Sequence, residues 1–208
     1  LVYYNGKYHM FYQHNPMGIR WGHMSWGHAV SKDLLHWQHL PIAIAEEKDT
    51  MIFSGTCVAD INNTSGFGKN GVAPMVAVYT GHIEGMNQSQ HIAYSVDDGI
   101  TWTKYNKNPV LDLHKKDFRD PKIFWYDQKK YWVMALMLSD IHVLQFYSSP
   151  DLKSWKHLSD FGPAGDTSGV WECPDLTQVP VDGEPGKKKW LLQMSMNASM
   201  QYFIGEFD

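Results

Sequence analysis

The stretch Ser31-Lys32-Asp33-Leu34-Leu35-His36-Trp37 decides the fold, because the chain repeats its pattern twice more. The second copy reads Ser95-x-Asp97 with Trp102, and the third reads Ser149-x-Asp151 with Trp155. Each copy follows an apolar stretch that alternates like a strand, and Ser and Asp side chains readily hydrogen-bond the backbone of their own turn. The pattern therefore predicts three hairpins of one kind, each with a tryptophan at the start of the return strand.

The spacing of the repeat indicates a β-propeller. The three tryptophans of the pattern are 65 and 53 residues apart, and units of this length with several short strands are typical of propeller blades. No segment has a convincing amphipathic helix pattern. We therefore expect an all-β chain without an internal domain boundary, in which residues 1–208 form one partial propeller.

Alternating segments predict the strands of four successive units. They are residues 1–4, 7–13, 28–31 and 36–44 in the first unit, 51–58, 75–80 and 91–95 in the second, 122–126, 131–138 and 142–148 in the third, and 176–179, 189–196 and 202–207 in the fourth. Propellers usually have about four to eight blades. With roughly three and a half blades and a strand pattern that is interrupted at both ends, the chain is interpreted as a fragment of a larger protein.

Composition argues against several classes of function. The net charge of −4 at pH 7 gives little electrostatic support to nucleic-acid binding. No apolar run approaches the ~18 residues of a membrane span, so no membrane insertion is expected. Two cysteines, Cys57 and Cys173, are too few for a disulfide framework and are expected to be free thiols. The nine tryptophans exceed what a core usually requires and favour a sugar-binding surface.

Two acidic motifs stand at equivalent places in successive units. Phe118-Arg119-Asp120-Pro121 precedes the first predicted strand of the third unit, and Trp171-Glu172-Cys173-Pro174-Asp175 precedes that of the fourth. The second unit has Phe53-Ser54-Gly55 there. Because the innermost strands of a propeller line its central channel, we expect Asp120 and Glu172 to meet at one funnel.

Two carboxyl groups that face one pocket suggest glycoside hydrolysis. One carboxyl group protonates the leaving oxygen, and another attacks the sugar carbon or activates water. The alternative is a structural role, in which Asp120 only pairs with Arg119 at a turn and Glu172 is solvated. The equivalent placement of the two acids, beside Phe118 and Trp171, favours the catalytic interpretation.

Taken together, these motifs resemble glycoside hydrolase family 32, the β-fructofuranosidases, which include invertases, exo-inulinases and levanases. The resemblance rests on the three motifs above and on Phe11-Tyr12-Gln13 with Trp21-Gly22, and it covers essentially the whole chain. It implies a five-bladed propeller followed by a C-terminal β-sandwich. The sandwich is expected to lie outside residues 1–208.

The resemblance also implies roles for individual residues. Glu172 matches the general acid/base, and Asp120 matches the transition-state stabiliser that binds fructosyl hydroxyls. Cys173 matches a cysteine that tunes the acid/base. The positions that match sugar contacts are Gln13, Trp21, Phe53, Ser54 and Arg119. From the residues alone, Trp21 and Trp26 could each be a sugar platform or a core residue, and the resemblance favours Trp21.

The nucleophile of the family is the aspartate of an Asn-Asp-Pro-Asn-Gly motif, and this chain starts at the Leu that would follow that motif. The implied aspartate would stand four residues before Leu1. The implied mechanism is retaining, with a fructosyl-enzyme intermediate. Residues 1–208 alone are therefore expected to be inactive. No metal or organic cofactor is expected, since the eleven histidines have no three-ligand pattern with an acid.

Three other functions remain open from the residues. Ser95-x-Asp97-x-Gly99-x-Thr101-Trp102 also resembles the Asp-box of sialidases, but the chain has only Arg20 and Arg119 to hold a substrate carboxylate. Arabinan- or xylan-active propeller glycosidases also place three acids around a funnel. A non-catalytic propeller that binds sugars is the alternative from another class.

The expected partner is an oligo- or polysaccharide, a fructan or sucrose. The sequence around Gly169-Val170-Trp171 and Gln201-Tyr202-Phe203 is similar to that of exo-acting levanases and inulinases. This similarity suggests a secreted or periplasmic enzyme that releases terminal fructose.

Overall fold

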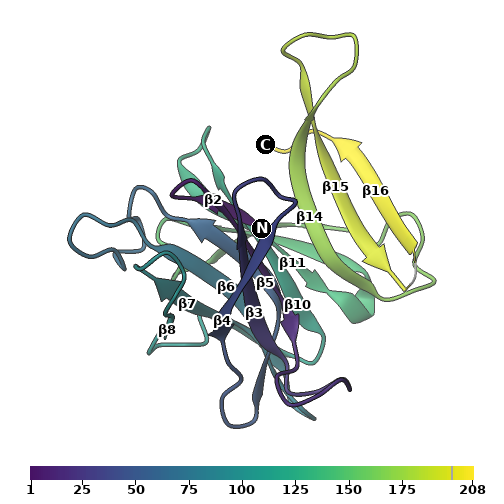
Figure 1. Ribbon diagram of the computed structural model, residues 1–208. Coiled ribbons are helices and arrows are strands. Elements are labelled where there is room, and N and C mark those ends of the chain that lie inside the picture. Colours follow the sequence, from purple (N-terminus) through teal and green to yellow (C-terminus); the bar gives the residue numbers. More distant parts are fainter. Residues whose placement is uncertain (198) are drawn as a thin grey trace.

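The computed structural model of the chain describes residues 1–197 and 199–208, and almost all of its regular structure is β-strand (Figure 1). Within these residues the single helical element is a 3-10 turn, Ser139–Ile141. The all-β prediction is confirmed. None of the described residues forms a helix with the length and apolar character that a membrane crossing requires.

The strands form four antiparallel sheets that follow one another along the chain. The first comprises β1 (Val2–Tyr4), β2 (Lys7–His14), β3 (Ser25–Ser31) and β4 (Trp37–Ile44). The second comprises β5 (Thr50–Ala59), β6 (Met75–Ile83), β7 (Gln88–Ser95) and β8 (Thr103–Lys104), with β9 (Leu111–Lys115) also paired to β7. The third comprises β10 (Phe118–Tyr126), β11 (Tyr131–Leu138), β12 (Val143–Ser149) and β13 (Lys156–Phe161), and the fourth comprises β14 (Trp171–Pro180), β15 (Lys188–Met196) and β16 (Ser199–Gly205). Strand order follows chain order in each sheet, as in the blades of a propeller.

The repeated Ser-x-Asp pattern forms the same turn three times, as predicted. In each copy the Ser hydroxyl donates to the Asp carboxylate two residues later. The indole N–H groups of Trp37, Trp102 and Trp155 each donate to the carbonyl three residues earlier, at 3.0–3.1 Å. The turn connects the third and fourth strands in each of the first three sheets, so its recurrence marks the repeating unit in the sequence.

Apolar side chains fill the space between neighbouring sheets. Trp26 and Ile52 belong to the cluster between the first and second sheets, Ile92 and Met134 to that between the second and third, and Trp171 to that between the third and fourth. This packing places the innermost strands side by side, since β10 contacts both β5 and β14 (Figure 1). The three motifs of the sequence therefore meet at one place.

Two details of the predicted strands are wrong. The acidic motifs do not precede the innermost strands but lie inside them, because Phe118 begins β10 and Trp171 begins β14. Phe118 and Arg119 already pair with β11, and Trp171 and Glu172 with β15, ahead of the β-bulge in each strand. The pairing therefore starts earlier than the alternation suggests. The last strand covers Ser199–Gly205 rather than residues 202–207.

Candidate functional site

A β-bulge interrupts the innermost strand of the second, third and fourth sheets, each time at its motif. The register shifts lie between Ile52 and Gly55 in β5, between Arg119 and Lys122 in β10, and between Glu172 and Asp175 in β14. A bulge leaves residues unpaired and re-aims their side chains. The motifs at these bulges face a common pocket for this reason.

Asp120 and Cys173 adopt left-handed backbone conformations within two of these bulges. Their φ angles are 65° and 50°, which for residues other than glycine costs on the order of 1–3 kcal/mol. Such strain persists only where the surroundings hold it in place. For both residues, neighbouring groups do so.

A buried chain of hydrogen bonds supports the backbone of Asp120. Its N–H donates to the hydroxyl of Thr80 at 3.0 Å. That hydroxyl donates to the side-chain oxygen of Gln90 at 2.9 Å, and the Gln90 amide N–H donates to the carbonyl of Phe118 at 2.8 Å. Thr80 and Gln90 are fully buried, so the second blade fixes the motif of the third.

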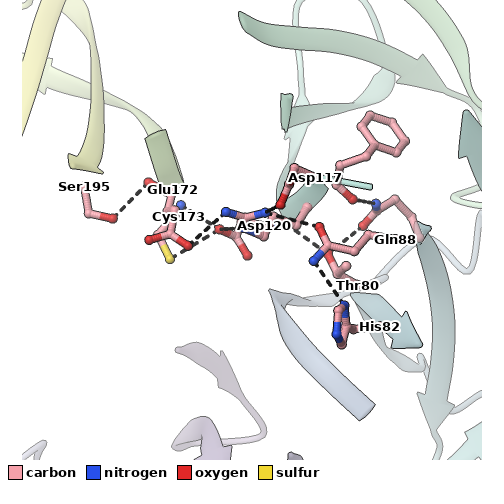
Figure 2. Close-up of polar contacts among 11 residues, drawn as sticks. Thr80, His82, Gln88, Asp117, Asp120, Glu172, Cys173 and Ser195 are labelled. Carbon is pink, nitrogen blue, oxygen red and sulfur yellow. Dashed lines mark hydrogen bonds and ion pairs between the residues drawn. The ribbon is translucent and has the colours of Figure 1, made fainter. Parts of the chain in front are cut away.

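All eight residues predicted for the site line one pocket of about 440 Å³. They are Gln13, Trp21, Phe53, Ser54, Arg119, Asp120, Glu172 and Cys173. Figure 2 shows Glu172 and Cys173 of β14 facing Asp120 of β10. The structure thus brings the predicted residues together, and their individual roles stay predictions.

The Arg119 guanidinium links the carboxylates of the pocket. It donates to Asp117 Oδ1 at 2.7 Å and to Glu172 Oε1 at 3.2 Å, and its Nε lies 4.0 Å from Asp120 Oδ2. Burial alone lowers the pKa of Arg119, but the hydrogen bond with Asp117 and the charges of Asp120 and Glu172 outweigh burial and raise that pKa. A permanently charged donor therefore lies between the two acids. Since Arg119 makes its close ion pairs with Asp117 and Glu172, the alternative of a simple Arg119–Asp120 turn pair does not describe this site.

Asp120 is the buried acid of the pocket, with only 6% of its surface exposed. Its Oδ2 accepts the backbone N–H of Cys173 at 2.9 Å, and the Cys173 sulfur lies 3.6 Å away. Burial raises the pKa of Asp120, against the lowering effects of the Cys173 N–H and Arg119. A carboxyl group held this way can bind the hydroxyl groups of a sugar.

Glu172 is the accessible acid of the pocket. Its side chain is 44% exposed, and its backbone carbonyl accepts the Ser195 hydroxyl at 3.1 Å. The side chain can therefore exchange protons with a bound molecule and with water.

The thiol of Cys173 is directed at Asp120. Burial, together with the charge of Asp120, raises the pKa of Cys173 to about 12, and the thiol therefore stays protonated and can donate to that carboxylate. Both cysteines are free thiols, as predicted. The predicted tuning of Glu172 by Cys173 stays a prediction, since the hydrogen bonds of Cys173 go to Asp120.

The aromatic residues near the pocket separate into a rim that lines it and a core behind it. Trp21 is 70% exposed and makes an edge contact with Phe53 at 6.1 Å between ring centroids. Trp26 is buried, and its indole N–H donates to the carbonyl of Phe53 at 2.9 Å. Of the two tryptophans that the residues left open, Trp21 is therefore available to a ligand and Trp26 is a core residue. Gln13 donates to the carbonyl of Ile52 at 3.0 Å, which ties β2 to β5 at the pocket.

Sequence reasoning missed four residues of the pocket, which are Met24, His82, Gln88 and Asp117. Asp117 directly precedes the Arg119 motif, and this position was the only available signal for it. His82 and Gln88 face each other across the β6–β7 hairpin, a pairing that depends on strand register.

No metal centre is evident in the part of the chain that the structure describes, where no three His, Cys, Asp or Glu side chains gather closely enough to hold an ion. His9 and His28 instead form a buried pair in the first blade, at 3.1 Å. The absence of a metal or cofactor requirement stays a prediction.

Comparison with known proteins extends over the whole chain. Residues 1–208 match the family described as the glycosyl hydrolases family 32 N-terminal domain. A levanase from Bacillus subtilis is 52% identical over 217 residues, which cover 100% of this chain and 32% of that protein. An extracellular exo-inulinase from Aspergillus awamori is 43% identical over 242 residues, which cover 100% of this chain and 45% of that protein.

Solved structures agree with these sequence matches. The crystal structure of the exo-inulinase from Aspergillus awamori superposes with a TM-score of 0.95 at 43% identity, over 100% of this chain and 47% of that one. A fructofuranosidase from Schwanniomyces occidentalis complexed with fructose superposes with a TM-score of 0.90 at 39% identity, over 98% of this chain and 42% of that one. The chain thus spans about a third to a half of the length of these relatives.

Proposed function

The chain belongs to glycosyl hydrolase family 32, and we propose that the full-length protein is a retaining, exo-acting β-fructosidase that releases terminal fructose from levan or inulin and from sucrose. The observation that carries this proposal is the Arg119 guanidinium between an accessible acid, Glu172, and a buried acid, Asp120, in one pocket. The relatives named levanase and exo-inulinase support the choice of substrate.

Glu172 acts in this mechanism as general acid and then as general base. It protonates the leaving glycosidic oxygen while the bond from that oxygen to fructose C2 breaks and a carboxylate attacks C2. Water then displaces the carboxylate from C2 and loses its proton to Glu172, and free fructose leaves. The exposed side chain of Glu172 and its single contact with Arg119 suit both steps.

Asp120 and Arg119 hold the fructosyl ring during these steps. Asp120 accepts hydrogen bonds from ring hydroxyls, an interaction that becomes stronger as the ring flattens toward the oxocarbenium ion. Its burial and the two donors from Cys173 keep the carboxylate in one orientation. Phe53, Ser54 and Trp21 line the same pocket and complete the space that holds the substrate.

The nucleophile is proposed to be an aspartate four residues before Leu1, as the family resemblance implies. Leu1 lines a second pocket together with Asp120 and Cys173, so residues directly upstream of Leu1 would lie near Asp120. We further propose that a fifth blade and a C-terminal β-sandwich complete the protein. The location is proposed to be extracellular or periplasmic, because the Aspergillus awamori relative is named as extracellular.

The test is product analysis with the full-length protein. We expect free fructose from levan, inulin and sucrose, and a loss of several orders of magnitude in kcat for sucrose in Glu172→Gln. A fructosyl substrate with a good leaving group should keep a fast first step in that variant, since it needs no proton. Glu184→Gln changes an exposed glutamate in the β14–β15 turn and is the matched control.

Four outcomes would contradict parts of this proposal. Unchanged sucrose hydrolysis in Glu172→Gln would remove Glu172 as the acid/base. Oligosaccharides without free fructose from levan would overturn exo action. Fructan binding without hydrolysis would favour the non-catalytic propeller, and hydrolysis of arabinan or xylan alone would favour the related propeller glycosidases.

A further inference from the structure

His82 lies on the rim of the pocket, at the end of β6. It is half-buried, and its imidazole ring lies parallel to the Phe53 ring with 4.4 Å between centroids and 13° between planes. The exposed Trp21 contacts the same Phe53. The rim thus presents three aromatic rings next to the buried Asp120.

Gln88 connects His82 to the catalytic cluster (Figure 2). The side chain of Gln88 is buried, its Oε1 lies 3.3 Å from Arg119 Nη1, and its Nε2 lies 3.2 Å from His82 Nδ1. A guanidinium group can only donate hydrogen bonds. The amide oxygen of Gln88 must therefore face Arg119, and its NH₂ group must face His82.

This orientation fixes the tautomer of His82. Because Gln88 donates to Nδ1, that nitrogen must accept, and a neutral imidazole then has its proton on Nε2. Burial lowers the pKa of His82, and the Arg119 charge lowers it further against the opposite effects of Glu84 and Asp117. The ring is therefore neutral at neutral pH. No described residue accepts a hydrogen bond from its Nε2.

We propose that His82 is a specificity-determining residue. This proposal rests on the β-fructosidase activity proposed above. Its Nε2–H donates to a hydroxyl group of the leaving-group sugar, while the Phe53–His82 stack supports that sugar's ring. The position of His82 in the pocket indicates that it contacts the leaving-group sugar. Asp120 holds the fructosyl unit at the buried end, whereas the half-buried His82 and Phe53 and the exposed Trp21 form the rim, toward which the leaving group must project.

Gln88 acts in this arrangement as a positioning residue. It touches no substrate, but it couples the fixed charge of Arg119 to the proton position on His82. The pairing of His82 with Gln88 across the β6–β7 hairpin holds the two side chains together.

Substrates that differ only in their leaving group test the role of His82 in the full-length protein. His82→Phe keeps an aromatic ring on Phe53 and removes the donor. We expect kcat/KM for sucrose and for a fructosyl-fructose to fall about five- to tenfold, the value of one hydrogen bond of ~1 kcal/mol. An aryl β-fructoside, which offers no hydroxyl group there, should be hydrolysed at the wild-type rate. His82→Gln retains a donor and should recover part of the loss.

Equal losses on the sugar and aryl substrates, or no loss on either, would overturn the role of His82. These results differ from a failure of the proposed function, in which the wild-type protein itself would release no fructose from any of the substrates.

The role of Gln88 is tested by the ¹⁵N chemical shifts of the His82 ring, assigned by their loss in His82→Phe. The wild-type ring should have its proton on Nε2. Gln88→Glu replaces the amide donor with an acceptor, which should move a proton to Nδ1 and change the leaving-group preference. A wild-type ring with its proton on Nδ1 would contradict this assignment.

Discussion

At the scale of single residues, the site depends on a left-handed backbone conformation that residues other than glycine do not favour. Asp120 has a φ angle of 65° in the middle of a strand. It is held there by the Thr80 hydroxyl, which accepts the N–H of Asp120. Two residues of the second blade, Thr80 and Gln90, thus position an acid of the third blade although neither faces the pocket.

Thr80→Val tests this support, because valine has nearly the same shape and lacks the hydroxyl. The N–H of Asp120 and the oxygen of Gln90 then lose their partner in a buried place, which costs about 1–3 kcal/mol of folding stability. We expect kcat/KM for sucrose to fall at least tenfold, with KM rising, since the carboxylate that binds the ring hydroxyls shifts. Activity is measured beside the thermal midpoint of unfolding.

The matched control for this change is Thr177→Val, at an exposed position of β14. It should leave both activity and the midpoint close to wild type. Thr80→Val with wild-type kcat/KM would show that the strained conformation of Asp120 does not depend on this hydrogen bond.

At the scale of elements, the innermost strands combine bulges with close packing. β5 resumes its pairing with β6 at Gly55, directly after its bulge. A Cβ atom on Gly55 would lie 2.2 Å from the carbonyl oxygen of Val78 and 2.6 Å from the Cα of Tyr79. Both are backbone atoms, so the neighbouring strand cannot move aside locally.

Gly55→Ala is therefore expected to destabilise the full-length protein by about 1–3 kcal/mol or more, the range of overpacked interiors. Activity should fall as well, because Phe53 and Ser54 in the adjacent bulge would shift. The measurement is the unfolding midpoint in urea. Gly205→Ala is the matched control, since a Cβ there meets no atom within 4 Å. Equal midpoints for the two variants would contradict the steric reason.

The elements also show which structural features could be predicted from the sequence. The Ser-x-Asp turns and the shared location of Asp120 and Glu172 were predictable from residue types at a fixed local spacing, and the other six pocket residues were predictable only from the resemblance to a known family. The bulges were not, since a bulge is a property of two paired strands and the alternation of one strand does not reveal it. His82 and Gln88 were missed for the same reason. Their contact depends on the register of a hairpin, and neither stands in a recognisable motif.

At the scale of the whole molecule, neighbouring blades are joined mainly by apolar packing, with a few polar contacts at the edges. Between the first and second blades, the Tyr4 hydroxyl donates to the carbonyl of Ala73 at 2.7 Å, and Asn5 donates to Asp98 at 2.7 Å. His9 and His28 lie beside these contacts. They are 1% and 0% exposed, and a Cβ atom on Gly99 of the second blade would contact the His28 ring at 2.9 Å.

This buried pair makes the stability of the blade interface depend on pH. Burial, together with the charge of His9, lowers the pKa of His28 to about 4. Burial also lowers the pKa of His9. In the unfolded chain both groups have a pKa near 6.5, so on acidification the unfolded chain binds protons that the folded chain resists. Their contribution to stability is therefore complete above about pH 6.5 and is lost as the pH falls toward 4.

His28→Gln tests this dependence, because glutamine can still hydrogen-bond His9 but does not titrate. In the full-length protein, each buried histidine adds up to about 1.4 kcal/mol per pH unit to the slope of unfolding free energy against pH in this window. We expect the slope between pH 6.5 and 4 to be smaller in His28→Gln than in wild type, whatever the absolute stability of the variant. His36→Gln removes an exposed histidine on the Ser31–Trp37 turn and should keep the wild-type slope. If His28→Gln and His36→Gln have the same slope, the acid sensitivity of the propeller arises outside the interface of its first two blades.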